Sequence, residues 1–124
     1  MKRMAILAAL SVAAAGIATT PAAAQANGQQ AFGQCRACHT LTKGGRNGVG
    51  PNLYGVINRP AASLPGFNYS AALKASKLKW DDKTLDQFLA APMKKVPGTR
   101  MPIGVADPAK RAALIGYLKT ETAK

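Results

Sequence analysis

The stretch Cys35-Arg36-Ala37-Cys38-His39 decides the fold of this chain, because it holds both cysteines and the single histidine of the sequence. The spacing C-x-x-C-H is typical of a covalent attachment site for a c-type haem. On a helix, residues three apart share a face, so both thiols can reach one flat macrocycle and bond to its vinyl groups. His39 would then lie beneath the ring and give one axial nitrogen to the iron.

Other sites compete for this cluster of cysteine and histidine. A zinc site normally needs four protein ligands, or three plus water in a catalytic site; this cluster offers three, and the chain has no further cysteine or histidine to complete a structural set. A thioredoxin-like C-x-x-C requires a βαβ context, for which the sequence shows no pattern. A simple disulfide between Cys35 and Cys38 stays open in an oxidising compartment. The motif favours one haem c, attached through Cys35 and Cys38.

Residues 1–24 have the composition of a secretory signal peptide. A positively charged start is followed by an alanine-rich apolar run, and Ala22-Ala23-Ala24 matches an A-x-A cleavage site. A retained membrane anchor is disfavoured, because serine, glycine and threonine interrupt a run that is already short for crossing a bilayer. We expect cleavage before Gln25, export to the periplasm, and a single mature domain over residues 25–124.

The charge balance predicts anionic partners. Loss of Lys2 and Arg3 with the signal peptide leaves fifteen basic residues against five acidic ones, a formal charge of +10 before haem. Such an excess says little about fold, but it attracts anionic surfaces. Nucleic acid is not expected for an exported chain without a nucleic-acid-binding motif. Acidic surfaces of other proteins are the better candidates, together with peripheral contact at an anionic membrane.

Helices are predicted at several places, and no stretch keeps the period of two that a strand requires. The first helix covers about residues 27–38 and carries the cysteines on its last turns. Ser70 is a suitable N-cap for a short helix over 70–77. Asp81 or Asp82 caps a helix that Pro92 ends, with a core face of Leu85, Phe88 and Leu89.

The last helix begins at Asp107-Pro108, with aspartate as N-cap and proline at the first helical position. It should end near Lys119, with a core face of Leu114, Ile115, Tyr117 and Leu118. Long loops remain over residues 41–50, 53–69 and 94–102, and loops of this length are unusual in so small a domain. A large flat apolar ligand explains them. The sequence therefore predicts an all-α fold in which helices and long loops wrap one haem.

The axial ligands of the iron need supporting groups. A metal-bound histidine requires an acceptor for its second ring N–H, and the Pro51 carbonyl is one candidate, although this proline could instead only stiffen its loop. After signal cleavage the chain keeps Met93 and Met101. Met101 lies between prolines that restrict the backbone, and a preorganised sulfur loses less entropy on binding. Unless a lysine takes the place of a methionine, the choice of a metal ligand opposite His39 lies between these two residues, and the restricted loop favours Met101 over Met93.

Several motifs in order resemble the class I (mitochondrial-type) cytochrome c of a bacterium. The resemblance covers nearly the whole mature chain. The stretches that carry it are Cys35–His39, Gly50-Pro51-Asn52-Leu53-Tyr54-Gly55, Pro65-Gly66-Phe67-Asn68-Tyr69-Ser70, Trp80, Thr84-Leu85, Pro97-Gly98-Thr99-Arg100-Met101 and Leu114–Lys119.

The resemblance implies roles for further residues in the class I cytochrome c fold. Met101 matches the distal axial ligand, and Pro51 matches the carbonyl that holds the proximal histidine. Thr99 matches a hydroxyl near the distal side. The residues that match hydrogen-bond donors to the haem propionates are Arg59, Tyr69 and Trp80. On the residues alone, the two aromatics could simply be core side chains and Arg59 a solvated loop charge.

The chain also departs from the family pattern. Phe88 stands where a tyrosine is usual, and Leu73 where an asparagine is frequent, so fewer polar groups should surround the distal methionine. The ligands themselves are not affected by these departures.

The resemblance also extends to the contact between helices. Gly28 matches the position where the first and last helices cross against Tyr117 and Leu118.

The resemblance implies a monomeric one-electron carrier rather than an enzyme, because His39 and Met101 would fill both axial positions of the iron. A cytochrome bc complex is the expected donor, and a terminal oxidase or photosynthetic reaction centre the expected acceptor. Two other functions stay open. One is a haem peroxidase-like enzyme in which the methionine is easily displaced, and the other is a dedicated electron-acceptor module of a periplasmic dehydrogenase.

Overall fold

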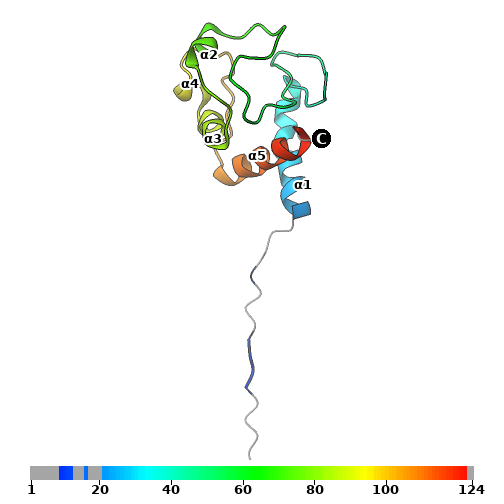
Figure 1. The fold of residues 1–124 in the computed structure, drawn as a ribbon. Coiled ribbons are helices and arrows are strands. Elements are labelled where there is room, and N and C mark those ends of the chain that lie inside the picture. The colour runs from blue at the N-terminus through cyan, green and yellow to red at the C-terminus, as the bar shows by residue number, and fades with distance from the viewer. Residues whose placement is uncertain (1–8, 13–15, 17–20, 123–124) are drawn as a thin grey trace, which may run out of the picture.

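The computed structural model describes residues 9–12, 16 and 21–122 (Figure 1). The rest of the predicted signal peptide lies outside the described residues. The fold consists of helices joined by long loops: α1 (Pro21–Phe32), η1 (Gly33–Ala37), α2 (Ala71–Ser76), α3 (Asp82–Ala90), α4 (Pro92–Lys95) and α5 (Pro108–Thr122). In this described part of the chain the β-pairing is one isolated antiparallel bridge, between Pro60 and Lys79. The predicted all-α architecture is confirmed.

The first helix begins earlier than predicted and ends differently. α1 starts at Pro21 rather than near residue 27, because proline suits the first helical position and alanine is the best helix former. The predicted cleavage site after Ala24 therefore lies within its first turns. Cys35 lies in the middle of η1, a 3₁₀ helix, and Cys38 is its C-cap; the backbone N–H of Cys38 and that of His39 both donate to the Cys35 carbonyl, at 3.1 and 2.9 Å. Side chains three apart are eclipsed in such a helix, so both thiols stay on one side.

The frame of the fold is the crossing of α1 and α5 (Figure 1). Gly28 lies at the crossing, where a Cβ would be 2.5 Å from the Cβ of Tyr117 and closer still to the Ala113 carbonyl oxygen. The rings of Phe32 and Tyr117 pack beside it with centroids 5.8 Å apart. Glycine therefore lets the two helices approach more closely than any other residue would.

The predicted caps are present in the structure. Ser70 Oγ accepts the N–H of Leu73, Asp81 Oδ1 accepts that of Thr84, and Asp107 Oδ1 accepts that of Ala109. Of the two aspartates proposed for α3, Asp81 is the N-cap. The predicted core faces of α3 and α5 are buried as well.

Two further element boundaries differ from the prediction. Residues 94–102 were predicted to be loop throughout, but Lys94 and Lys95 complete the short helix α4. Pro92 begins this helix, because its fixed φ suits the first turn and its missing N–H is not needed there. α5 runs to Thr122 rather than ending near Lys119, and the Thr122 hydroxyl donates to the Leu118 carbonyl at 2.7 Å.

The long loop after residue 53 is ordered by pairing with residues 78–80. The N–H of Asn58 donates to the Trp80 carbonyl at 2.8 Å, that of Trp80 to the Arg59 carbonyl at 2.9 Å, and that of Ala61 to the Leu78 carbonyl at 2.8 Å. This pairing places Arg59 next to Trp80 although the two are distant in sequence. None of the helices within the described ranges has the length and apolar character needed to cross a membrane.

Candidate functional site

A cavity of about 380 Å³ lies among the helices and the long loops. Every residue that the sequence analysis proposed as a binding residue lines it: Cys35, Cys38, His39, Pro51, Arg59, Tyr69, Trp80, Thr99 and Met101. These residues come from η1 and from three separate loops, so the fold brings them together rather than the sequence alone.

Apolar side chains form most of the cavity wall. They come from α1, α2, α3 and α5 and from the loops: Phe32, Leu53, Val56, Phe67, Leu73, Leu85, Phe88, Leu89, Leu114 and Leu118. The sequence predicted several of them as core residues, but they face a cavity as well as one another. The periodicity of an amphipathic helix cannot distinguish burial against protein from burial against a ligand.

The two cysteines are half-buried on the cavity wall, and both thiols are free. Burial raises the pKa of the Cys35 thiol, and the neighbouring Cys38 raises it further. A disulfide between them, which the sequence left open, is therefore not formed in the structure.

The imidazole of His39 is held by the carbonyl of Pro51, with 2.7 Å between Nδ1 and the oxygen. Because a carbonyl can only accept, Nδ1 carries the hydrogen and Nε2 keeps its lone pair. Burial lowers the pKa of His39, and the bond to Pro51 partly opposes this by raising it. Gly50 packs against the ring so closely that a Cβ would be 2.7 Å from Nε2. The loop thus fixes both the tautomer and the position of the imidazole.

The loop that carries Pro51 is closed by Asn52, which the sequence analysis did not single out. Its buried side chain donates from Nδ2 to the carbonyls of Thr42 and Gly45, at 2.8 and 2.9 Å, and accepts the Tyr54 N–H at 2.9 Å. A polar residue between Pro51 and Leu53 was the available signal, since buried amides normally have partners.

Met101 reaches the cavity from the loop between α4 and α5. It is half-buried, whereas Met93 is 56% exposed and does not line the cavity. The loop turns at Gly98, whose φ of +91° favours glycine. The Met101 N–H then donates to Thr99 Oγ1 at 3.3 Å. Thr99 therefore supports the backbone of the residue that bears the thioether.

Arg59, Tyr69 and Trp80 add polar groups to one part of the wall. Arg59 is half-buried and donates to the carbonyls of Tyr54 and Asn52, at 3.1 and 3.3 Å. Burial lowers its pKa, while Tyr69 raises it, and the guanidinium stays charged at neutral pH. The Tyr69 hydroxyl accepts the Leu64 N–H at 3.2 Å, so its own hydrogen is free to be donated.

The cavity wall is apolar at the two positions where the chain departs from the family pattern. Phe88 and Leu73 both line the cavity, and the Phe88 ring packs against Trp80 with centroids 5.0 Å apart. The departures from the family pattern therefore lie in the site itself.

These groups fit a c-type haem. Two free thiols on one side of the wall suit its vinyl carbons, and an imidazole with a free Nε2 and a thioether suit its iron. Apolar walls suit the porphyrin faces, and a half-buried cation suits carboxylates, because a buried charge requires a partner.

The comparisons with known proteins point to one family. The cytochrome c family matches residues 25–122. A cytochrome c2 of Rhodoblastus acidophilus is 48% identical over 92 residues, which cover 73% of this chain and 86% of that protein. A cytochrome c2 iso-2 of Magnetospirillum fulvum is 46% identical over 96 residues, covering 77% of this chain and 99% of that protein.

Solved structures give the same result. Cytochrome cH from Methylobacterium extorquens superimposes with a TM-score of 0.72 and 49% sequence identity, covering 77% of this chain and 97% of that one. The predicted class I fold and the predicted cofactor are confirmed. The chain therefore belongs to the cytochrome c family, as a bacterial class I member with a covalent c-type haem.

Proposed function

We propose that this protein is a one-electron carrier whose haem iron is ligated by His39 Nε2 and by the thioether of Met101. The bound haem supplies the one-electron couple between ferric and ferrous iron. The observation that carries the proposal is that one apolar cavity collects both thiols, the imidazole and the thioether of Met101, while the only other methionine of the predicted mature chain is exposed.

The protein residues hold the cofactor and tune it. Cys35 and Cys38 form the thioether bonds, and the Pro51 carbonyl keeps the imidazole in the tautomer that leaves Nε2 free. The apolar wall excludes water and so disfavours the more highly charged ferric form. The thioether of Met101 acts in the same direction, because Met/His ligation raises the potential of c-type haems.

Arg59, Tyr69 and Trp80 would bind the haem carboxylates. Arg59 is fixed by the carbonyls of Tyr54 and Asn52, and a half-buried guanidinium beside an apolar cavity gains most from an anionic partner. Neutralising these carboxylates inside the protein would also keep them from attracting water into the cavity. This pairing is the role that the sequence analysis proposed for the three residues.

Two axial protein ligands leave no iron position for a substrate, so the proposal is a carrier and not an enzyme. A peroxidase-like activity requires that Met101 leave the iron readily. Rapid consumption of hydrogen peroxide by the native protein would favour that alternative. A dedicated dehydrogenase module would bind its one partner tightly at high salt, whereas a carrier should release its partners.

Export to the periplasm after cleavage at Ala24 and function as a monomer complete the proposal. The expected partners are acidic surfaces of a cytochrome bc complex, a terminal oxidase or a reaction centre. Lys94 and Arg100 are exposed near the Met101 loop, and Val49 and Ile103, on the cavity wall, are 82% and 58% exposed. A surface with apolar contacts and surrounding positive charge suits brief electrostatic docking.

The experiment that tests the ligation compares Met101→Ala with Met93→Ala. Met101→Ala should abolish the near-red sulfur-to-iron band of the ferric protein and lower its redox potential in a titration. Met93→Ala should leave both nearly unchanged, because Met93 lies outside the cavity. The opposite pattern would overturn the assignment.

A further inference from the structure

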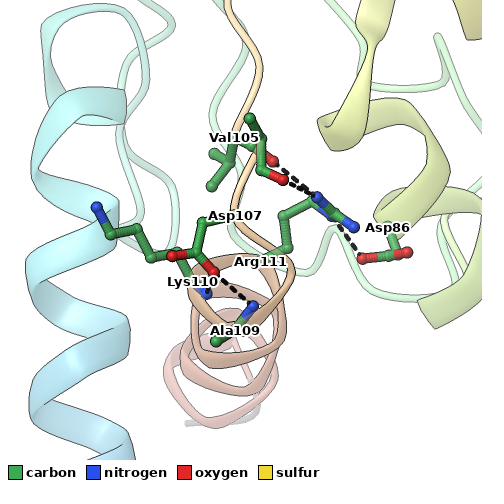
Figure 2. A network of polar contacts seen from close by, with 7 residues as sticks. Asp86, Val105, Asp107, Ala109, Lys110 and Arg111 are labelled. Carbon is green, nitrogen blue, oxygen red and sulfur yellow. Dashed lines mark hydrogen bonds and ion pairs between the residues drawn. The ribbon is translucent and has the colours of Figure 1, made fainter.

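A partly buried arginine holds the segment that connects Met101 to α5. Figure 2 shows Arg111, in the first turns of α5, reaching both α3 and the preceding segment. Its Nε donates to Asp86 Oδ1 at 2.8 Å, and its Nη1 donates to the carbonyls of Val105 and Ala106 at 3.0 and 2.8 Å. One side chain therefore connects a helix of the cavity wall with the end of the Met101 loop.

The Arg111–Asp86 pair differs from an ordinary surface ion pair. Only 11% of the Arg111 side chain is exposed, against 46% for Asp86. Solvent screens a partly buried pair less than an exposed one, and its charge-assisted hydrogen bonds are stronger. The planar guanidinium also presents its N–H groups in a fixed arrangement, so that the carboxylate on one edge orients the donors on another.

The same segment is joined to α3 through its backbone. The Val105 N–H donates to the Leu89 carbonyl at 2.7 Å. Gly104 lies so close to α3 that a Cβ would be 2.7 Å from the same carbonyl oxygen. Leu89 is part of the cavity wall, and Val105 is buried in the core. Val105 is thus hydrogen-bonded to a residue that lines the cavity.

The residues on the other side of Met101 have their own anchor. The Thr99 N–H donates to the Val96 carbonyl at 3.0 Å, and Arg100 donates to the Asn68 carbonyl at 2.9 Å. Between the two anchors, Pro102 and Ile103 are exposed. A loop held at two points opens when the weaker point releases, and local openings of this kind occur without global unfolding.

We propose that Arg111, oriented by Asp86, is a positioning residue for Met101: it determines how readily the thioether leaves the iron. The inference rests on the ligation proposed above. With the Arg111 bonds in place, the segment after Met101 stays on α3 and the sulfur is held at the cavity. Without them, the segment opens more often, and an external ligand competes with the sulfur more successfully.

The test titrates imidazole into the ferric haem-loaded protein and follows the loss of the near-red sulfur-to-iron band. Arg111→Gln should increase the apparent affinity for imidazole about tenfold, the factor expected for losing charge-assisted hydrogen bonds that hold the closed loop. Asp86→Asn should give a smaller increase, since the bonds from Arg111 to both carbonyls are kept. Arg111→Lys should fall between wild type and Arg111→Gln.

Lys119→Gln is the matched control. Lys119 pairs with Asp82, so this variant also breaks an α3–α5 ion pair and removes one positive charge. Lys119 lies two turns further along α5 and makes no contact with the 102–107 segment among the hydrogen bonds of the described residues. Its affinity for imidazole should match that of wild type. Hydrogen exchange of the Val105 amide should accelerate in Arg111→Gln and not in Lys119→Gln.

The outcomes separate this inference from the ligation. If Met101→Ala loses the band while Arg111→Gln and Lys119→Gln shift imidazole affinity and Val105 exchange equally, the positioning role is wrong and the ligation stands. If Met101→Ala keeps the band, the ligation fails, and the inference fails with it. Should Arg111→Gln not fold, Asp86→Asn replaces it in the comparison with Lys119→Gln.

Discussion

Replacing Gly28 with alanine should destabilise the protein, although alanine is the better helix former. Gly28 lies in the middle of α1, where this helix crosses α5. The added Cβ would be 2.5 Å from the Cβ of Tyr117 and closer still to the carbonyl oxygen of Ala113. Carbon atoms in good contact are about 3.5–4.0 Å apart, so the helices would have to separate by about 1 Å.

The size of the effect follows from two opposing terms. Overpacking of this kind costs about 1–3 kcal/mol, and the upper half of that range applies here because Ala113 presents backbone that cannot rotate away. The gain in helix propensity is about 1 kcal/mol. We expect a net loss of about 1–2 kcal/mol in the free energy of unfolding, together with a fall in Tm of about 5–15 °C.

Gly116→Ala provides the matched control. Gly116 lies on α5, is exposed, and has no atom within 4 Å of the position where a Cβ would be added. This variant should gain about 0.5–1 kcal/mol from helix propensity alone. Guanidinium unfolding of the haem-loaded variants, followed by far-ultraviolet circular dichroism, measures both changes. If Gly28→Ala is as stable as Gly116→Ala, the close crossing is not what requires glycine.

Three further changes test the site and its surface. Asn52→Ala should lower the free energy of unfolding by about 1–3 kcal/mol, since the Thr42 and Gly45 carbonyls lose their donor and the Tyr54 N–H its acceptor, and chemical denaturation measures it. Lys94→Glu should slow reaction with an acidic redox partner about tenfold at low salt, whereas Lys110→Glu should slow it less; equal effects at all salt concentrations would contradict electrostatic steering. Hydrogen bonds from the backbone N–H and side chain of Thr84 hold the pKa of Asp81 below its ordinary value. The stability difference between wild type and Asp81→Ala should therefore be full above about pH 4 and shrink as the pH falls through that lowered pKa.

The features that the sequence predicted well are local ones. The caps Ser70, Asp81 and Asp107 were found because a capping side chain bonds to a backbone N–H two or three residues away. The haem motif is local as well, since its thiols and imidazole lie within five consecutive residues. The more distant binding residues, such as Arg59 and Met101, were found through the family resemblance, and the structure places them on the same cavity.

The features that were missed depend on contacts distant in sequence. Arg111 looks like any other exposed helix residue until α3 places Asp86 beside it, 25 positions earlier in the chain. The pairing of residues 58–61 with 78–80 involves only a few backbone hydrogen bonds. Such a short pairing leaves no alternating pattern of apolar residues from which it could be predicted. Asn52 gave only the weak signal of a polar residue among apolar ones. The contacts that support ligand-binding loops join residues distant in sequence, so they cannot be predicted from local patterns.

The five carboxylates of the chain all have partners within the fold, so they are already engaged there and the excess of basic residues remains. Each of the five carboxylates is engaged within the structure. Two cap helices, two pair with α5 from one face of α3, and one accepts from α1; the pairs are Asp81 with Thr84, Asp107 with Ala109, Asp82 with Lys119, Asp86 with Arg111, and Glu121 with Gln25. The predicted mature chain has fifteen basic residues, and all five of its carboxylates already have partners within the fold. The remaining positive charge destabilises the compact protein by self-repulsion, and the acidic partner surfaces proposed above would neutralise it.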